Sequence, residues 1–192
     1  MSSRSPIRDF LLAIHPVPDL ILDEYVSHWH EYTVSRKTIM TAPGEVERYS
    51  YFVLEGIQKS YYQTDGKQHV IAFTYNPSFS GIPESFFTQS PAPYFLESIT
   101  DSTFLRIAYS DHVAQMAKHR EIETLFRKAT EGFVIGLLHR YHEMMAFDME
   151  KRFRSFTRRS PHLLHMVPHK DIASYLGIDP TNFSKLINSV KI

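Results

Sequence analysis

The chain has 192 residues and no cysteine, and this absence excludes several kinds of site. Without thiols there is no disulfide framework, no thiolate nucleophile, no zinc finger and no cysteine-held iron–sulfur cluster. The sequence also lacks internal repeats, low-complexity tracts and any apolar run that could span a bilayer. The apolar run before His15 is too short for a secretory signal, so a cytoplasmic location is expected.

A net charge is absent as well, because 21 lysines and arginines balance 21 aspartates and glutamates. The balance is uneven: residues 148–192 carry eight basic and four acidic residues, whereas residues 1–147 carry thirteen and seventeen. A basic C-terminal segment is the pattern expected of a module that neutralises phosphates. A solvated helix face explains its main basic run equally well. That run consists of Lys151, Arg152, Arg154, Arg158 and Arg159.

The segment 168–192, PHKDIASYLGIDPTNFSKLINSVKI, has the residue spacing of a helix-turn-helix. Two closely crossing helices need a small residue where they touch, and Ala173 provides it. Gly177 can end the first helix with a positive φ. Asp179 is placed to cap the second helix, and Pro180 follows where no N–H is missed. A small core is expected from Ile172, Leu176, Ile178, Phe183 and Leu186.

Residues 32–109 form short β-branched and aromatic runs that are separated by turn residues. The clearest hairpin pairs IQKSYYQT with KQHVIAFT across Asp65 and Gly66, which readily adopt the positive φ angles of a tight turn. Several such strands predict a barrel or a roll. Ahead of them, residues 19–31 have helical spacing, with Asp19 as the expected cap.

Residues 120–146 place apolar side chains at spacings of three and four, which predicts one helix about 40 Å long. A second helical stretch, residues 148–159, leads into the C-terminal module. The long helix cannot bury its apolar stripe against one small β domain, so we expect two copies of the chain to pack along it. Packing within one chain is the alternative, but it leaves an aggregation-prone stripe. The predicted dimer interface comprises Leu125, Ala129, Phe133, Leu137 and Tyr141.

A β-roll, a long helix and a C-terminal helix-turn-helix, in this order, resemble the Crp/Fnr family of bacterial transcription regulators. Within the roll, residues 42–67 are similar to the family's cyclic-nucleotide-binding-type domain, with glycines at its hairpin positions. The resemblance implies an α+β fold with a β-roll (a double-stranded β-helix) over residues 1–119, a dimerisation helix over 120–146 and a DNA-binding domain over 147–192. It further implies a homodimer on a near-palindromic site in double-stranded DNA.

The stretch SGIPESFFTQSPAPYFLESIT departs from the cyclic-nucleotide-binding members of that family. In those members a Gly-Glu pair, followed at a fixed distance by Arg-Ser or Arg-Thr, holds the ribose and the cyclic phosphate. Here Gly81 matches, but Ile82 replaces the acid, and Ala92 and Pro93 replace the arginine and the hydroxyl. Cyclic AMP is therefore not expected to bind in the usual pose. A pocket for another, unknown effector is expected around Gly81, Ile82, Glu84, Ala92 and Tyr94.

The resemblance places positions 180, 181 and 185 against base edges, with two recognition helices in successive major grooves about 34 Å apart. Of Pro180, Thr181 and Lys185, only the lysine is a strong donor, and guanine O6 or N7 is its natural partner. Asn182 and Ser184 are expected to touch bases or phosphate, whereas His169, Lys170 and Asp179 position the DNA backbone.

The sequence ends at Ile192, directly after the predicted recognition helix, whereas longer members of the family continue into a β wing. The phosphate contacts of a wing are then expected to be missing. This predicts a modest affinity with a steep salt dependence, or a partner such as RNA polymerase that holds the protein on its site.

Two other functions fit parts of the sequence. A cupin-type metal enzyme shares the β-roll and would draw ligands from His28, His30, Glu31 and His69. However, His28 and His30 lie two residues apart on a predicted helix and would face different sides, so no metal is expected. A ligand-binding adaptor would keep the dimer and contact protein instead of DNA. Hydrolysis is not indicated, because no serine lies in a nucleophile elbow.

Overall fold

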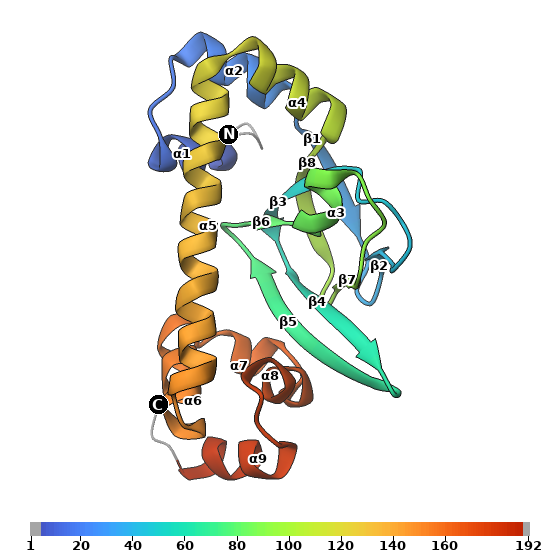
Figure 1. The fold of residues 1–192 in the computed structure, drawn as a ribbon, viewed down its shortest axis with the longest axis vertical. Coiled ribbons are helices and arrows are strands. Elements are labelled where there is room, and N and C mark those ends of the chain that lie inside the picture. Colours follow the sequence, from blue (N-terminus) through green and yellow to red (C-terminus); the bar gives the residue numbers. More distant parts are fainter. Residues whose placement is uncertain (1–4, 190–192) are drawn as a thin grey trace. The chain divides into compact units, whose positions relative to one another are not determined.

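The computed structural model describes residues 5–189 and divides into two compact units. Unit 1 comprises Met1–Ser60 and Phe73–Gly132, and unit 2 comprises Tyr61–Ala72 and Phe133–Ile192. Helices and strands are both well represented, so the α+β class predicted from the sequence is confirmed (Figure 1).

The predicted roll consists of two four-stranded sheets (Figure 1). In the first sheet the order is β1 (His30–Val34), β8 (Ser102–Ala108), β3 (Tyr49–Glu55) and β6 (Phe79–Ser80). In the second it is β2 (Ile39–Thr41), β7 (Phe95–Ser98), β4 (Ile57–Thr64) and β5 (Lys67–Tyr75). The predicted hairpin joins β4 to β5, and both of its turn residues have positive φ, 52° at Asp65 and 73° at Gly66.

Alternation along β8 separates two hydrophobic cores on the two faces of the first sheet. Phe104 contributes to the inner core, which also contains Leu96 of β7 and Val53 of β3. Leu105 and Ile107 point the other way, into a core that helices supply. We call the side of Phe104 the inner face of the first sheet and the side of Leu105 its outer face.

The outer face is covered by the N-terminal helices and the start of the long helix. These are α1 (Ser5–Ile14), α2 (Asp19–Ser27) and α5 (Arg120–Ala146), while α4 (Tyr109–Lys118) continues directly from β8. The sequence did not predict α1. The helix predicted for residues 19–31 begins at Asp19 as predicted, but its cap and its C-terminal end were wrong. Pro18 precedes the first turn, where the Asp19 carboxylate pairs with Arg8 instead of capping the helix. The helix ends at Ser27, because His30 already pairs with β8.

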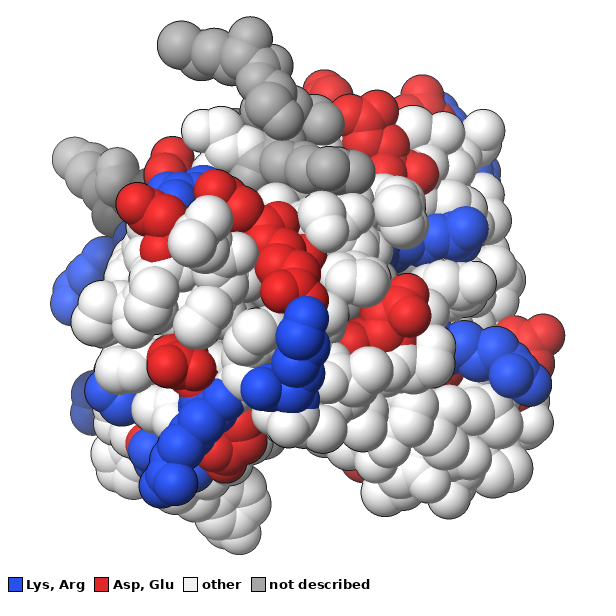
Figure 2. Space-filling model, turned by 90° about the horizontal axis from the view of Figure 1, so that it is seen from above, with Lys and Arg blue, Asp and Glu red and all other residues white. Residues whose placement is uncertain are grey.

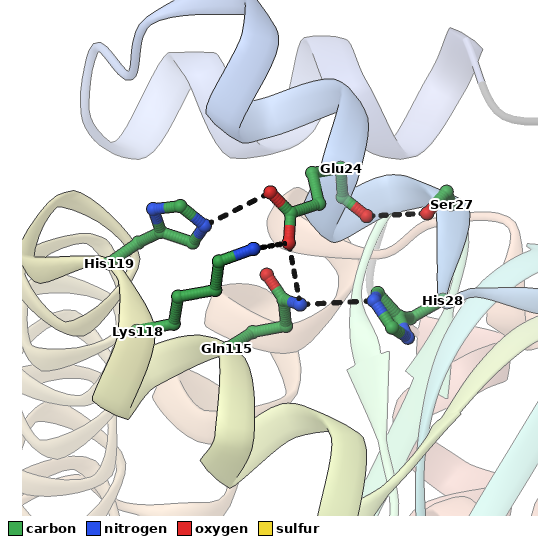
Figure 3. A network of polar contacts seen from close by, with 6 residues as sticks. All are labelled: Glu24, Ser27, His28, Gln115, Lys118 and His119. Carbon is green, nitrogen blue, oxygen red and sulfur yellow. Dashed lines mark hydrogen bonds and ion pairs between the residues drawn. The ribbon is translucent and has the colours of Figure 1, made fainter.

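A polar network around Glu24 joins α2 to α4 and to His119, which follows α4 (Figure 3). The Glu24 carboxylate accepts from Lys118 Nζ at 2.5 Å and from Gln115 Nε2 at 3.1 Å, and it lies 3.2 Å from His119 Nε2. The hydrogen bond from Lys118 contributes most to lowering the Glu24 pKa to about 2. Gln115 also contacts His28 Nε2 at 3.0 Å, so this histidine belongs to the network that fixes α2.

The long helix α5 spans the predicted residues, Arg120–Ala146. Its first turns belong to unit 1 and the part from Phe133 onward belongs to unit 2. The next helix, α6 (Met149–Arg159), starts at Asp148, whose side chain accepts from the backbone N–H of Lys151 at 2.8 Å. Three further helices follow, namely α7 (Leu163–Met166), α8 (His169–Leu176) and α9 (Pro180–Ser189). No helix between residues 5 and 189 is both long and apolar enough to cross a membrane.

Candidate nucleic-acid interface

The turn between α8 and α9 has the geometry predicted from the glycine. Gly177 adopts φ 60° and ψ 39°, a left-handed conformation. Its N–H donates to Ser174 O at 3.0 Å, and the next N–H, of Ile178, donates to Ala173 O at 2.9 Å. These two bonds satisfy carbonyls at the end of α8 and fix the direction in which the chain leaves it. The positive φ itself disfavours any residue with a side chain at position 177.

The start of α9 is capped as predicted. The Asp179 carboxylate accepts from the backbone N–H of Thr181 at 2.8 Å and from that of Asn182 at 3.4 Å. Pro180 is the first helical residue and has no N–H to satisfy. The two signals together give α9 a defined first turn, which is the turn expected to meet DNA.

The two helices close on a hydrophobic core in unit 2. Phe183 of α9 contacts Phe153 of α6 edge-on, with ring centroids 5.6 Å apart. The predicted core residues are buried except Leu186, which is half-buried. The α6 contribution was not predicted, although Phe153 and Phe156 have helical spacing and could have suggested it. The buried set comprises Ile172, Ala173, Leu176, Ile178, Phe183, Phe153 and Phe156.

The outward face of α9 is polar and carries little charge. Thr181, Ser184 and Lys185 are exposed, whereas Asn182 is half-buried. Asn188, which sequence reasoning missed, is exposed on the same face and donates to Ser184 O at 2.9 Å. Its spacing of four from Ser184 was the available signal. The face therefore offers one cation, two hydroxyls and amide groups, the donors and acceptors that can read base edges.

The two predicted contacts at the start of α8 differ in their surroundings. His169 Nε2 lies 3.2 Å from Leu164 O, and its ring packs against Phe183 with centroids 5.8 Å apart. Lys170 is exposed and has no hydrogen bond or ion pair anywhere in residues 5–189. Lys170 can therefore reach an external phosphate, while His169 is tied to its own module.

The basic run on α6 is largely neutralised within the module. Arg154 pairs with Glu150, Lys151 lies near Asp148, and Arg159 pairs with Glu143. The Arg152 guanidinium lies 3.9 Å from the sulfur of Met144, next to Gly177. Arg158 is exposed and has no partner among the described residues. The solvated-face interpretation thus holds for most of the run, and Arg158 is the member left for phosphate.

Arg140 connects α5 to α8 within unit 2. Its guanidinium donates to the carbonyl oxygen of Tyr175 and stacks 3.9 Å from the centre of the Tyr175 ring. Burial lowers the Arg140 pKa, and Arg152 and Arg159 act in the same direction. Because the accepting carbonyl lies in the last turn of α8, this arginine fixes the first helix of the pair to the long helix.

The first half of strand β5 also contacts α8 within unit 2. The Ser174 hydroxyl accepts from the backbone N–H of Val70 and donates to Gln68 O, both at 3.0 Å. One side chain thus satisfies two backbone groups of the hairpin. Removal of the hydroxyl would leave both groups without this partner.

The predicted dimer stripe is partly internal and partly exposed. Leu125 is fully buried in the outer core of unit 1, so it has no surface left for a second subunit, and Ala129 is half-buried. The stretch 133–145 carries large apolar side chains that are between 46% and 70% exposed. They are Phe133, Val134, Ile135, Leu137, Leu138, Tyr141 and Met145. Gly132 and Gly136 lie in open space on the same helix.

The predicted effector-pocket residues lie at the inner core of the roll. Ile82, Ala92 and Tyr94 are buried there, next to Leu96 and Phe104. The Tyr94 hydroxyl donates to Glu84 Oε2 at 2.5 Å, and Glu84 lies in α3 (Pro83–Thr88). Gly81 precedes this helix with φ 146°. Apolar side chains thus fill the positions at which the resemblance places the acid and the arginine of a phosphate clamp.

The histidines and acidic residues that the structure describes do not gather into a metal-binding cluster. Within residues 5–189 no three histidine, aspartate or glutamate side chains are grouped so that they could hold a metal ion. His30 lies on β1 and His69 on β5, in different units. The face drawn in Figure 2 shows basic and acidic side chains interspersed.

Several solved bacterial regulators share this fold. FixK2 from Bradyrhizobium japonicum is similar with a TM-score of 0.71 and 17% identity over 83% of each chain. The catabolite activator protein of Thermus thermophilus is similar with a TM-score of 0.57 and 14% identity, over 92% of this chain and 84% of its own. The c-di-GMP-responsive global regulator CLP of Xanthomonas campestris is similar with a TM-score of 0.63 and 15% identity. The match covers 89% of this chain and 90% of the chain of CLP. These structural neighbours are Crp/Fnr regulators, whereas no family model and no curated protein matches the sequence.

Proposed function

We propose that the protein is a homodimeric transcription regulator that places α9 of each subunit in a major groove of double-stranded DNA. The observation that carries the proposal is the α8–α9 pair, in which the Gly177 turn and the Asp179 cap hold a polar helix face outward. Such a face, held rigidly by a buried core, is what groove reading requires. The function places the protein in the cytoplasm, as the sequence predicts.

The exposed apolar part of α5 supports the homodimer. Large aliphatic and aromatic side chains exposed along three turns of one helix are an aggregation liability in a monomer. A second copy packed along residues 133–145 would bury them and would duplicate α9 about a two-fold axis. A near-palindromic operator then follows from the symmetry of the protein.

Lys185 is the residue on which we expect base reading to depend most. Its side chain is exposed near the middle of α9, and it has no ion pair among the described residues. Backbone positioning would come from the free cations Lys170 and Arg158. Because these are few, we expect binding to be modest in affinity and sensitive to salt, and a partner such as RNA polymerase stays a prediction.

Selection of bound sequences from random duplexes tests the proposal. We expect enrichment of a near-palindrome, and then a loss of about 1–3 kcal/mol for Lys185→Ala on the selected site with a smaller loss on random duplex. Lys67→Ala, which removes an exposed lysine from the hairpin tip, is the matched control and should bind as wild type. Equal losses on both duplexes would contradict base reading by Lys185. A stable dimer that enriches no sequence would favour the protein-binding adaptor.

A further inference from the structure

Four side chains with unused hydrogen-bond donors meet on the inner face of the first sheet. Tyr32 comes from β1, Tyr49 and Tyr51 from β3, and Arg106 from β8. Arg106 is the direct cross-strand partner of Tyr51. All four follow the alternation of Phe104 and Val53, whose side chains lie in the inner core. Within residues 5–189 none of the four side chains forms a hydrogen bond or an ion pair.

The Arg106 guanidinium is held by aromatic rings. Its central carbon lies 4.0 Å from the centre of the Tyr32 ring and 4.3 Å from that of Tyr49. Stacking uses the faces of the guanidinium and leaves the N–H groups in its plane free. These N–H groups form the planar fork that matches a carboxylate or a phosphate. Arg106 and the two rings are half-buried, so the fork is fixed in orientation and still reachable.

The Tyr51 ring lies beside both of these rings, with its centroid 5.9 Å from that of Tyr32 and 6.3 Å from that of Tyr49. Tyr51 is only 4% exposed, and the charged or titratable groups that act on its hydroxyl are Glu47, Tyr32, Arg106 and Tyr49. Burial raises the pKa of Tyr51, so its hydroxyl stays a proton donor at neutral pH. A half-buried guanidinium without a counter-ion is costly for the fold alone, and three hydroxyls beside it add donors without adding a negative charge.

The carboxyl group of Glu47, which acts electrostatically on Tyr51, is engaged by another side chain. Glu47 Oε2 accepts from Thr41 Oγ1 at 2.7 Å, and Glu47 makes no ion pair with Arg106. Burial raises the pKa of Glu47 to about 7, so this group is a weak source of negative charge at neutral pH. Within residues 5–189 the positive charge of Arg106 is therefore not balanced by an ion pair.

We infer that Arg106, with the hydroxyls of Tyr32, Tyr49 and Tyr51, binds the carboxylate or phosphate group of a small organic anion. The side chains of the site come from strands β1, β3 and β8. They adjoin Ile82 and Ala92, which belong to the same inner core as Tyr51. Binding itself is independent of the DNA-binding proposal. The use of the anion as an effector rests on that proposed function.

The test measures the binding of defined anions to the full chain. Inorganic phosphate, glycerol 3-phosphate and benzoate are titrated at constant ionic strength, with sodium chloride as the reference salt, and binding is followed by thermal shift and calorimetry. We expect at least one probe to raise the Tm by about 3 °C at ten times its Kd. The phosphate ester and the aromatic carboxylate distinguish the two sources of the oxyanion.

Substitutions test whether the rise in Tm on anion binding depends on the four side chains. Arg106→Gln should weaken binding about 10- to 100-fold, because it removes a charge-assisted pair. Arg36→Gln removes an exposed arginine of unit 1 and should leave the affinity unchanged. Tyr51→Phe keeps the aromatic packing and removes one hydrogen-bond donor, so it should weaken anion binding about fivefold. This variant tests the inference if Arg106→Gln does not fold.

Three results would overturn the inference. They are an absence of stabilisation by all three probes, an unchanged affinity in both Arg106→Gln and Tyr51→Phe, or an equal loss in Arg36→Gln. DNA binding is measured separately on the same proteins, so a failure here and a failure of the regulator proposal are distinguishable.

Discussion

A buried histidine makes the stability of unit 1 depend on pH. His112 is 5% exposed, its Nδ1 lies 3.0 Å from the Tyr25 hydroxyl, and its ring centroid is 4.5 Å from that of Phe126. Burial lowers its pKa from 6.5 to about 4. The folded state therefore holds this imidazole neutral at a pH where the unfolded chain would protonate it.

We expect the free energy of unfolding to fall as the pH falls from about 6.5 to 4, by about 3 kcal/mol from this group. Stability falls with falling pH because His112 takes up a proton in the unfolded chain at a higher pH than in the folded protein. Urea unfolding at pH 7, 5.5 and 4.5 measures it. His112→Gln should be less stable at pH 7 and should lose less on acidification. An identical pH dependence in both proteins would contradict the assignment.

We expect Ile82 and Ala92 to determine how the roll responds to cyclic AMP. Both are buried in the inner core, where neither can supply a hydrogen bond from its side chain to a phosphate. We expect cyclic AMP to leave the Tm unchanged at millimolar concentration, because the charge-assisted bonds of a phosphate clamp are missing. A thermal-shift titration checks this. Clear stabilisation that persists in Arg106→Gln would show that these positions have been misinterpreted.

For single residues, the roles that depend on neighbours in the sequence were predictable, and contacts with residues far along the chain were not. The Gly177 turn and the Asp179 cap depend on residues within four positions of each other, so their chemistry appears in the sequence itself. The contacts of Arg140 with Tyr175 and of Ser174 with Gln68 join residues that are 35 and 106 positions apart. Nothing in either local sequence indicates the partner.

At the scale of elements, Arg140 is the side chain whose loss should uncouple α5 from α8. Arg140→Met keeps much of the aliphatic stem and removes both the bond to Tyr175 O and the stacking on its ring. We expect a loss of about 1–3 kcal/mol in stability and weaker DNA binding, with the dimer retained. Chemical unfolding, gel shift and sedimentation measure the three properties.

Arg127→Met is the control on the same helix. Arg127 pairs with Glu131 at the surface, with both side chains more than half exposed, and such pairs contribute little. We expect its stability to stay within about 0.5 kcal/mol of wild type. If both variants behaved alike, the Arg140 contact would have no special role.

Element prediction succeeded where a long periodic pattern existed. Helix α5 has 27 residues of consistent spacing and was predicted with its observed ends, whereas the pattern over residues 19–31 continued past the true end of α2. There, pairing of β1 with β8 overrides the helical spacing, a tertiary effect that local sequence does not report. The same pattern could not separate Leu125, which faces its own core, from Leu137, which is exposed.

At the scale of the whole molecule, the dimer should depend on the exposed part of α5. Leu137→Glu places a charge among the exposed apolar side chains and should convert the dimer to a monomer. Leu20→Glu changes another exposed leucine, 86% exposed on α2, and should remain dimeric. Sedimentation equilibrium distinguishes the two outcomes. A dimeric Leu137→Glu protein would exclude this face as the interface.

The assembled molecule could be predicted only in its order of parts. The roll, the long helix and the helix-turn-helix follow from composition and spacing along the chain. Residues 61–72 of the β4–β5 hairpin belong to the same compact unit as α8 and α9. This could not be predicted from the sequence, because it depends on contacts that form only after folding.

Gly132 and Gly136 have a consequence for how the protein responds to its own abundance. Each costs a helix interior about 1 kcal/mol relative to alanine. A Cβ added at either position would meet no atom within 4 Å beyond its own stretch of helix. In an isolated subunit this part of α5 should therefore fray, and a partner's side chains would restore its order. Helical content would then rise with chain concentration, so gene dosage and dilution at cell division would set how much protein is competent to act.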